Sequence, residues 1–201
     1  MIPRARAHVN SIDAPARLCY NCGNGGVKGR CAPLTDSKLY LMAELDADSQ
    51  RAMREYFAAV QAATGAGGAP PEIPYHVTLG TFEMGSEEYA VALMKRVLPG
   101  RKQLTLRLDH IGIFGGSVVF IAPNATVELF EMVRGFFPDA CTGSHMFAPH
   151  VTLYSGDTET AFRAAQALAG AFVPGDARLV AVSLYQFPPS RFIHRMELDG
   201  M

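Results

Sequence analysis

The stretch Pro74-Tyr75-His76-Val77-Thr78-Leu79 is nearly repeated later in the chain, at Pro149-His150-Val151-Thr152-Leu153. Each copy contains His-Val-Thr-Leu shortly after a proline, and its short run of apolar and β-branched residues predicts a β-strand. Side chains two residues apart in a strand point to the same face. We therefore expect the histidine and threonine of each copy to share one face, with the valine and leucine opposite. Two such strands brought together would place two imidazoles and two hydroxyls in one cleft.

This set of side chains suits chemistry at a phosphate. In-line displacement at phosphorus needs a base on the attacking oxygen and an acid on the leaving oxygen, and imidazole serves both roles because it titrates near neutral pH. Threonine hydroxyls can donate hydrogen bonds to the non-bridging phosphate oxygens. We therefore predict His76 and His150 as catalytic residues and Thr78 and Thr152 as substrate-binding residues. This chemistry requires no metal ion or other cofactor, and no carboxylate cluster accompanies the motifs.

Composition limits the class of protein. The chain has 201 residues, of which 49% are hydrophobic, enough for one sizeable core or one domain with two lobes. Its formal net charge of -1 argues against a broad basic surface for long nucleic acids, although it is compatible with a nucleotide or a short RNA. No apolar run approaches the roughly 18–20 residues of a membrane-spanning helix, and no secretory signal is evident. We expect a soluble cytoplasmic protein without a membrane partner, and a monomer.

The first 36 residues differ from the rest in composition. Residues 1–36 are rich in Gly, Pro and Arg and show no lasting periodicity, which predicts a disordered arm before a folded domain at 37–201. Cys19, Cys22 and Cys31 lie in this arm. They are either zinc ligands, with His8 as a fourth, or free thiols in a flexible leader.

The remaining chain shows an internal duplication. Strands are predicted at 39–45, 103–114, 117–122, 178–187 and 192–198, in addition to the two motif strands, of which the first ends at Phe82. Four helices are predicted to begin at the capping residues Asp46, Ser86, Asn124 and Asp157. Each half therefore reads strand, helix, motif strand, helix, strand. This pattern favours an α+β fold with two lobes around a central groove.

The two His-x-Thr motifs, one on an equivalent element of each half, resemble the signature of the 2H phosphoesterase superfamily. The family includes 2′-5′ RNA ligase-like proteins and 2′,3′-cyclic phosphodiesterases. The resemblance covers about residues 38–198, and the Gly-Ile-Phe-Gly-Gly segment at 112–116 is similar to the family's central strand pair. It implies a two-lobed, pseudo-symmetric fold with antiparallel sheets lining a central groove and helices outside.

The resemblance also implies a function. It implies metal-independent hydrolysis of a 2′,3′-cyclic phosphate or a 2′-5′ phosphodiester in a nucleotide or short RNA. His76 would protonate the leaving oxygen and His150 would activate the nucleophile. Two alternatives stay open at this point: a non-catalytic nucleotide- or RNA-binding module, and a 2′-5′ RNA ligase.

Further substrate contacts are expected from aromatic residues and one arginine. Bases need a stacking surface. Phe82 and Tyr154 lie an even number of residues from their motif histidines, so they would share the histidine face if each strand is regular. Phe114, at the central hairpin, is a third stacking candidate. Arg191 follows Pro188-Pro189-Ser190 and would reach a terminal phosphate.

Overall fold

The computed structural model describes residues 37–65, 72–124, 126–138 and 147–200. The predicted arm at 1–36, together with its candidate zinc ligands, lies outside the described residues. Among the described helices, none combines the length and the apolar character needed to cross a bilayer.

All seven predicted strands and all four predicted helices are present in the described part of the chain. In chain order they are β1 (Lys38–Leu45), α1 (Ala47–Thr64), β2 (His76–Glu83), α2 (Glu87–Val97), β3 (Leu104–Phe114), β4 (Val118–Pro123), α3 (Val127–Phe136), β5 (Val151–Ser155), α4 (Thr158–Ala171), β6 (Gly175–Phe187) and β7 (Arg191–Glu197). The α+β class predicted from the sequence is therefore confirmed.

The duplication is visible in both element order and sheet topology. The series β1-α1-β2-α2-β3 is followed by β4-α3-β5-α4-β6, and the strands pair in the order β2-β1-β6-β3-β4-β5. Exchanging each strand of one half with its counterpart in the other half gives the same order read from the opposite edge of the sheet. The long strand β6 joins the halves, because its start pairs with β3 and the rest pairs with β1. The last strand, β7, adds to the free edge of β6.

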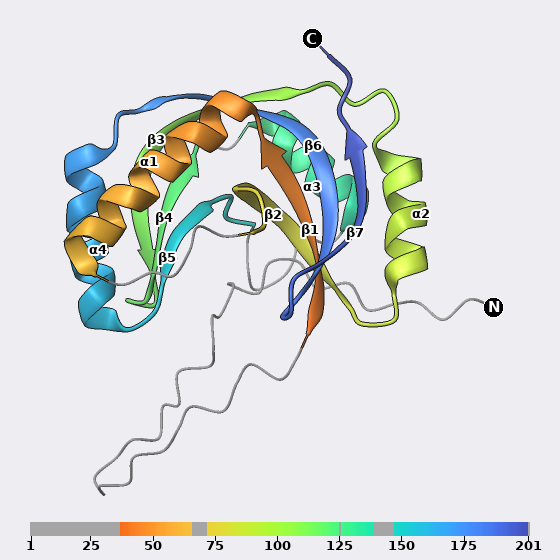
Figure 1. Ribbon diagram of the computed structural model, residues 1–201. Coiled ribbons are helices and arrows are strands. Elements are labelled where there is room, and N and C mark those ends of the chain that lie inside the picture. Colours follow the sequence, from red (N-terminus) through yellow and green to blue (C-terminus); the bar gives the residue numbers. More distant parts are fainter. Residues whose placement is uncertain (1–36, 66–71, 125, 139–146, 201) are drawn as a thin grey trace, which may run out of the picture.

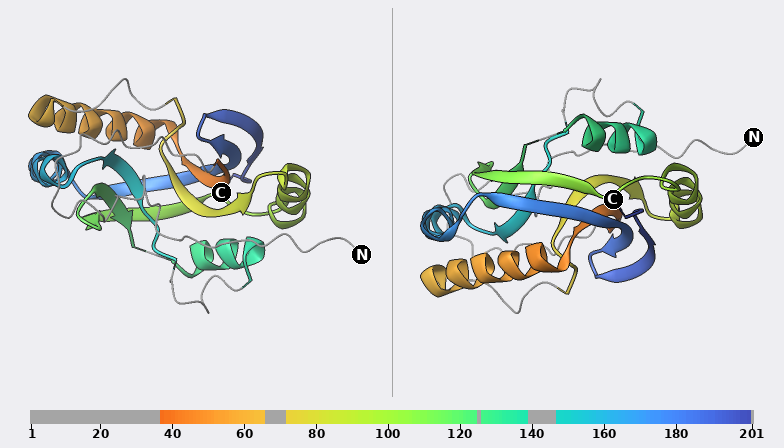
Figure 2. Two further views of the ribbon diagram at one scale, coloured as in Figure 1. Left: turned by 90° about the horizontal axis from the view of Figure 1, so that it is seen from below. Right: turned by 90° about the horizontal axis from the view of Figure 1, so that it is seen from above.

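Helices cover the sheet on both sides. Figure 2 shows α1 and α3 on opposite sides of the strands. Helix α1 packs against α4, and α2 packs against α3, so each layer combines helices from both halves (Figure 1). The core between these layers contains the aliphatic residues of both motif strands, Val77, Leu79, Val151 and Leu153, all at most 3% exposed. The valines and leucines of both motifs thus lie in the core.

Helix ends follow local side-chain chemistry, with one correction. Asp46 and Asp157 accept hydrogen bonds from Ser49 N and Thr160 N, as expected for N-caps, and Gly65 ends α1 in the left-handed conformation. The prediction of Asn124 as the cap of α3 is wrong. Thr126 holds that position and accepts from Leu129 N, while the Asn124 amide donates to Asp109.

Two large apolar helix residues are exposed. Val127 of α3 is 70% exposed and Phe162 of α4 is 58% exposed. In α4 the buried residues are Thr160, Ala161, Ala164 and Leu168. Phe162 therefore lies beside the packed face and not on it. Small residues on this face allow α4 to approach α1 closely.

We expect Gly80→Ala in β2 to destabilise the fold. A Cβ atom at Gly80 would lie 2.3 Å from the Phe137 ring, which is itself buried. Overpacking of this kind costs about 1–3 kcal/mol. Gly170→Ala in α4 is the matched control, because nothing lies within 4 Å of that position and alanine is the better helix former. Urea unfolding should show a lower free energy for Gly80→Ala and an equal or higher one for Gly170→Ala. Equal stability of the two variants would contradict the packing argument.

Candidate active site

The two motif histidines occupy equivalent positions at the start of their strands. His76 is the first residue of β2, and His150 immediately precedes β5. Strands β2 and β5 belong to opposite ends of the pairing order, yet their Cα atoms come within 8 Å of each other, and Figure 1 shows them side by side. The fold therefore brings the two motif strands together.

Each histidine ring is held by the same backbone contact. His76 Nδ1 lies 2.7 Å from Pro74 O, and His150 Nδ1 lies 2.8 Å from Ala148 O. A carbonyl oxygen can only accept a hydrogen bond, so Nδ1 is the donor in both rings. Nε2 is then the nitrogen that exchanges a proton in each ring. The carbonyl two residues before each histidine thus selects its tautomer and orients it.

Both motif strands carry a β-bulge at the same residue of the motif. Between β1 and β2 the pairing passes from Met42↔Thr78 to Leu41↔Gly80 and skips Leu79. Between β4 and β5 it passes from Phe120↔Thr152 to Val119↔Tyr154 and skips Leu153 in the same way. A bulge shifts the side-chain alternation by one residue. Every residue after the motif leucine therefore lies on the face opposite to the one that a regular strand would give.

Because of the bulges, two of the residues predicted to stack on a base lie on the other face of the sheet. Phe82 shares a face with Leu39 in the core, is 1% exposed, and packs against Phe137 with the ring centroids 5.1 Å apart. Tyr154 packs against the core, and its hydroxyl donates to Asp157 at 3.4 Å. The prediction that both share the face of their motif histidine is wrong because the strands are not regular.

Phenylalanine rings surround His150, which is 5% exposed. Phe114 and Phe120 lie with ring centroids 4.9 and 5.3 Å from the imidazole, and they stack on each other at 4.1 Å. Gly112 makes room for this cluster, since a Cβ there would lie 2.2 Å from the Phe120 ring. Phe114 therefore lies beside a motif histidine, with its ring packed edge to face against His150. Phe120, the cross-strand neighbour of Thr152, was missed because its strand reads as uniformly buried.

The surroundings of His76 are polar instead. Glu44 is its cross-strand partner on β1, and this carboxylate is only 6% exposed. Glu44 accepts a hydrogen bond from Ser183 and one of 2.8 Å from Arg195 Nε. Sequence reasoning missed this set, although a single glutamate within the apolar segment Leu39–Leu45 was a usable signal. The threonines also differ, because Thr78 is buried and Thr152 is exposed.

Gln50 of α1 positions the segment before His76. Its amide nitrogen donates to Tyr75 O at 2.7 Å, and its amide oxygen accepts from Tyr75 N at 2.9 Å. The Tyr75 side chain packs in the core, and burial raises the pKa of its hydroxyl to about 12. The start of the first motif is therefore fixed to the first helix.

Comparison with known proteins identifies the family. Residues 48–188 match the model of the 2′-5′ RNA ligase superfamily. The chain belongs to this superfamily. The match confirms the 2H phosphoesterase recognition drawn from the sequence. A search of curated protein sequences gives no match.

Solved structures of similar fold agree with this assignment. Escherichia coli LigT in its apo form is 17% identical, with a TM-score of 0.53 over 81% of this chain and 97% of LigT. LigT complexed with ATP is 21% identical, with a TM-score of 0.53 over 81% and 98% of the two chains. TT0787 of Thermus thermophilus is 17% identical, with a TM-score of 0.57 over 81% and 98%. The predicted 2H phosphoesterase fold is thus confirmed.

Arg191 of this superfamily member does not lie on the face of His76. It is paired in register with Gln186, whose partner on β1 is the buried Leu39. Its guanidinium donates to Gln186 Oε1 at 2.8 Å and to Glu87 of α2 at 3.3 Å. The expectation that Arg191 reaches a substrate phosphate is therefore wrong, because β7 turns this side chain towards α2.

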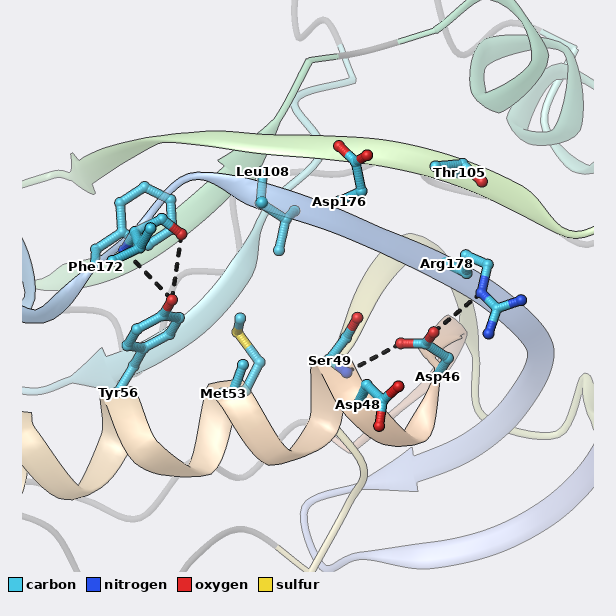
Figure 3. A pocket seen from close by; sticks show the side chains of 13 residues that line it. Asp46, Asp48, Ser49, Met53, Tyr56, Thr105, Leu108, Phe172, Asp176 and Arg178 are labelled. Atoms are coloured by element: carbon cyan, nitrogen blue, oxygen red, sulfur yellow. Dashed lines mark hydrogen bonds and ion pairs between the residues drawn. The ribbon is translucent and has the colours of Figure 1, made fainter.

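A cleft of about 380 Å³ lies away from both motifs, between the start of α1 and strands β3 and β6 (Figure 3). Polar groups that line the cleft form hydrogen bonds with neighbouring protein groups. Asp46 accepts from Ser49 N and from Arg178 Nε at 3.1 Å, and the Tyr56 hydroxyl donates to Val173 O. Neither His76 nor His150 lines this cleft, so it is not part of the candidate active site. Asp46, which lines it, caps α1. Over the described segments, no three His, Cys, Asp or Glu side chains are grouped to hold a metal ion.

We expect the Asp46 carboxylate to stabilise the protein in a pH-dependent way. Partial burial alone would raise its pKa, but hydrogen bonds from Ser49 and the Arg178 guanidinium outweigh it, and the pKa lies below its ordinary value of 3.8. Asp46→Asn should cost about 0.5–1 kcal/mol at pH 7. Because the folded-state pKa is lowered, this difference is complete above about pH 4 and is lost as the pH falls through the lowered value.

Urea unfolding between pH 7 and about pH 3 measures this difference. Asp48→Asn is the matched control, since Asp48 lies in the first turn of the same helix with its side chain 78% exposed and paired with the exposed Arg51. A cost of Asp46→Asn that stays constant down to pH 3, or one equal to that of Asp48→Asn, would refute the role of the Arg178 pair.

Proposed function

We propose that this protein is a metal-independent phosphodiesterase that hydrolyses a 2′,3′-cyclic phosphate or a 2′-5′ phosphodiester of a nucleotide or short RNA. The observation that carries the proposal is the matched pair of histidines. Each ring is fixed by an Nδ1 hydrogen bond to the carbonyl two residues before it, on strands that approach each other. Each therefore directs Nε2 to proton transfer, as a paired acid and base require.

The different surroundings of the two rings support an assignment of roles. The family resemblance implies that His150 activates the nucleophile and that His76 protonates the leaving oxygen, and the two rings do lie in different surroundings. His150 lies against two phenylalanine rings, whereas His76 lies across β1 from Glu44. We assign His150 as the general base and His76 as the general acid.

The proposed reaction follows from these roles. With a 2′,3′-cyclic phosphate, water attacks phosphorus as His150 Nε2 takes its proton. The bond from phosphorus to one ribose oxygen breaks, and His76 gives that oxygen a proton. The product is a ribose phosphomonoester, and proton exchange with water restores both rings. Thr78 and Thr152 donate hydrogen bonds to the non-bridging oxygens, whose charge grows in the transition state.

The known ligands of a related protein support the substrate class. LigT has been solved in complex with ATP, with 3′-AMP and with phosphate. A phosphate and a nucleoside with its base are therefore accommodated by a protein of this fold. We extend this property to the present chain as part of the proposal.

The first test is hydrolysis of the four nucleoside 2′,3′-cyclic monophosphates and of 2′-5′-linked dinucleotides in EDTA. We expect turnover by the wild type, and a loss of about 10²–10⁴-fold in kcat in His76→Ala and in His150→Ala, because each variant lacks one proton-transfer group. His194→Ala is the matched control. His194 lies on β7 in register with the buried Leu184, on the face opposite to Arg195.

The possible outcomes separate the alternatives. Turnover that disappears in EDTA and returns with a divalent metal would refute the metal-independent mechanism. Binding of these compounds without turnover would leave a nucleotide-binding module. Joining of RNA ends that carry a 2′,3′-cyclic phosphate and a 5′-hydroxyl would show the ligase activity instead.

The pH dependence of the reaction provides a second prediction. One histidine must start neutral and the other protonated, so kcat/KM should follow a bell-shaped curve whose two limbs belong to the coupled pair. The measurement is kcat/KM between about pH 5 and 9, the range in which imidazoles titrate. A flat profile over that range would contradict the two-histidine mechanism.

A further inference from the structure

Strand register defines which side chains lie beside the candidate phosphate site. Among the neighbouring strands β2, β1, β6 and β7, cross-strand partners share a face of the sheet. His76, Glu44 and Ala181 form one row on the site face, and the next row along the strands contains Thr78, Met42, Ser183 and Arg195. Rows on one face are about 7 Å apart, because every second residue points the same way.

The next rows on this face are aromatic. Thr81, Tyr40, Tyr185 and Phe192 form the row after that of Thr78, and Phe187 follows beside Lys38. Tyr185 and Phe192 pack edge to face at 5.5 Å, and Tyr40 and Phe187 do so at 6.2 Å. We call these four residues, Tyr40, Tyr185, Phe187 and Phe192, the aromatic platform.

The platform is open to solvent on an otherwise well-packed sheet. Phe192 is 55% exposed and Phe187 is 40% exposed, whereas Tyr40 and Tyr185 are partly buried beneath them. The facing helices α2 and α3 cover the other side of these strands, where Phe82 lies against Tyr89 and Phe137. The exposed rings are therefore not part of the core.

The charges around the platform are balanced. Arg195 is paired with Glu44 and Glu197, and Lys38 lies 3.5 Å from Glu83. Such a surface offers little net attraction for a row of phosphates. It suits flat, uncharged rings, and nucleobases are the flat rings attached to the phosphate that the motifs would bind.

We propose that the aromatic platform stacks a base of a nucleotide adjacent to the reacting phosphate, so that the preferred substrate is a single-stranded oligonucleotide. The inference rests on the proposed function, because it places the reacting phosphate at His76 and Thr78. It replaces the predicted stacking residues Phe82 and Tyr154, which lie in the core. The occupant is taken to be a base of the same substrate, because the platform begins in the row next to that of Thr78 on the same face and so adjoins the proposed phosphate position.

The test compares two substrates that carry the same reacting group. One is a nucleoside 2′,3′-cyclic monophosphate, and the other is a single-stranded tetraribonucleotide that ends in the same cyclic phosphate. Base stacking on aromatic side chains should make kcat/KM about 5- to 150-fold higher for the tetranucleotide. In Phe192→Ala this ratio should fall towards one, whereas Phe192→Trp should preserve it by keeping a ring.

Phe162→Ala is the matched control. It removes the same ring from a position of similar exposure, 58%, on α4. It should leave the ratio unchanged. The advantage of the tetranucleotide should also persist when salt is raised from about 50 to 200 mM, because stacking releases few counterions.

Binding separates failure of this inference from failure of the proposed function. The probe is a fluorescein-labelled tetraribonucleotide with a 3′-phosphate, measured by anisotropy. Weaker binding to Phe192→Ala than to Phe162→Ala supports the platform even if no substrate is turned over. Equal kcat/KM for the two substrates, or a ratio that Phe192→Ala and Phe162→Ala change alike, overturns the platform while the phosphodiesterase stands. Binding that needs Phe192 but is equal for duplex RNA also overturns it, because paired bases are not free to stack.

Discussion

The arrangement of the candidate site depends on one backbone irregularity that occurs twice. A regular strand would place every second residue after His76 or His150 on the site face. The bulges at Leu79 and Leu153 end that alternation directly after the threonine of each motif. Each motif strand thus places one histidine and one threonine on the site face, and the aromatic residue that follows the bulge turns to the other face. A short polar site can therefore be built on strands that otherwise belong to the core.

The duplicated backbone carries different side chains in its two halves. The cross-strand partner of Thr78 is Met42 and that of Thr152 is Phe120. His76 faces the carboxylate of Glu44 across the strands, whereas His150 is enclosed by phenylalanines. An enzyme with a separate acid and base needs two equivalent positions in unequal surroundings. The two motifs occupy equivalent positions, and the strands beside them differ in the way that the proposed roles require.

Sequence patterns predicted most of the fold and the centre of the site. Apolar and β-branched runs predicted the strands and capping residues predicted the helix starts, apart from Asn124, because these signals are local. The two His-x-Thr motifs indicated the superfamily, which the family match confirms. The stacking residues Phe82 and Tyr154 were wrong, since a bulge leaves no mark in the sequence. Arg191 was wrong because its face depends on the register between β6 and β7.

The sequence by itself determined the α+β class, the duplication and the side chains of the motif, because these follow from local pattern and repetition. Tertiary structure alone decided which side chains accompany them. Glu44, Phe120 and the aromatic platform come from strands distant in the chain, and only pairing and register bring them to the motif face. Register is set by packing of the whole sheet against its helices, so no single segment encodes it.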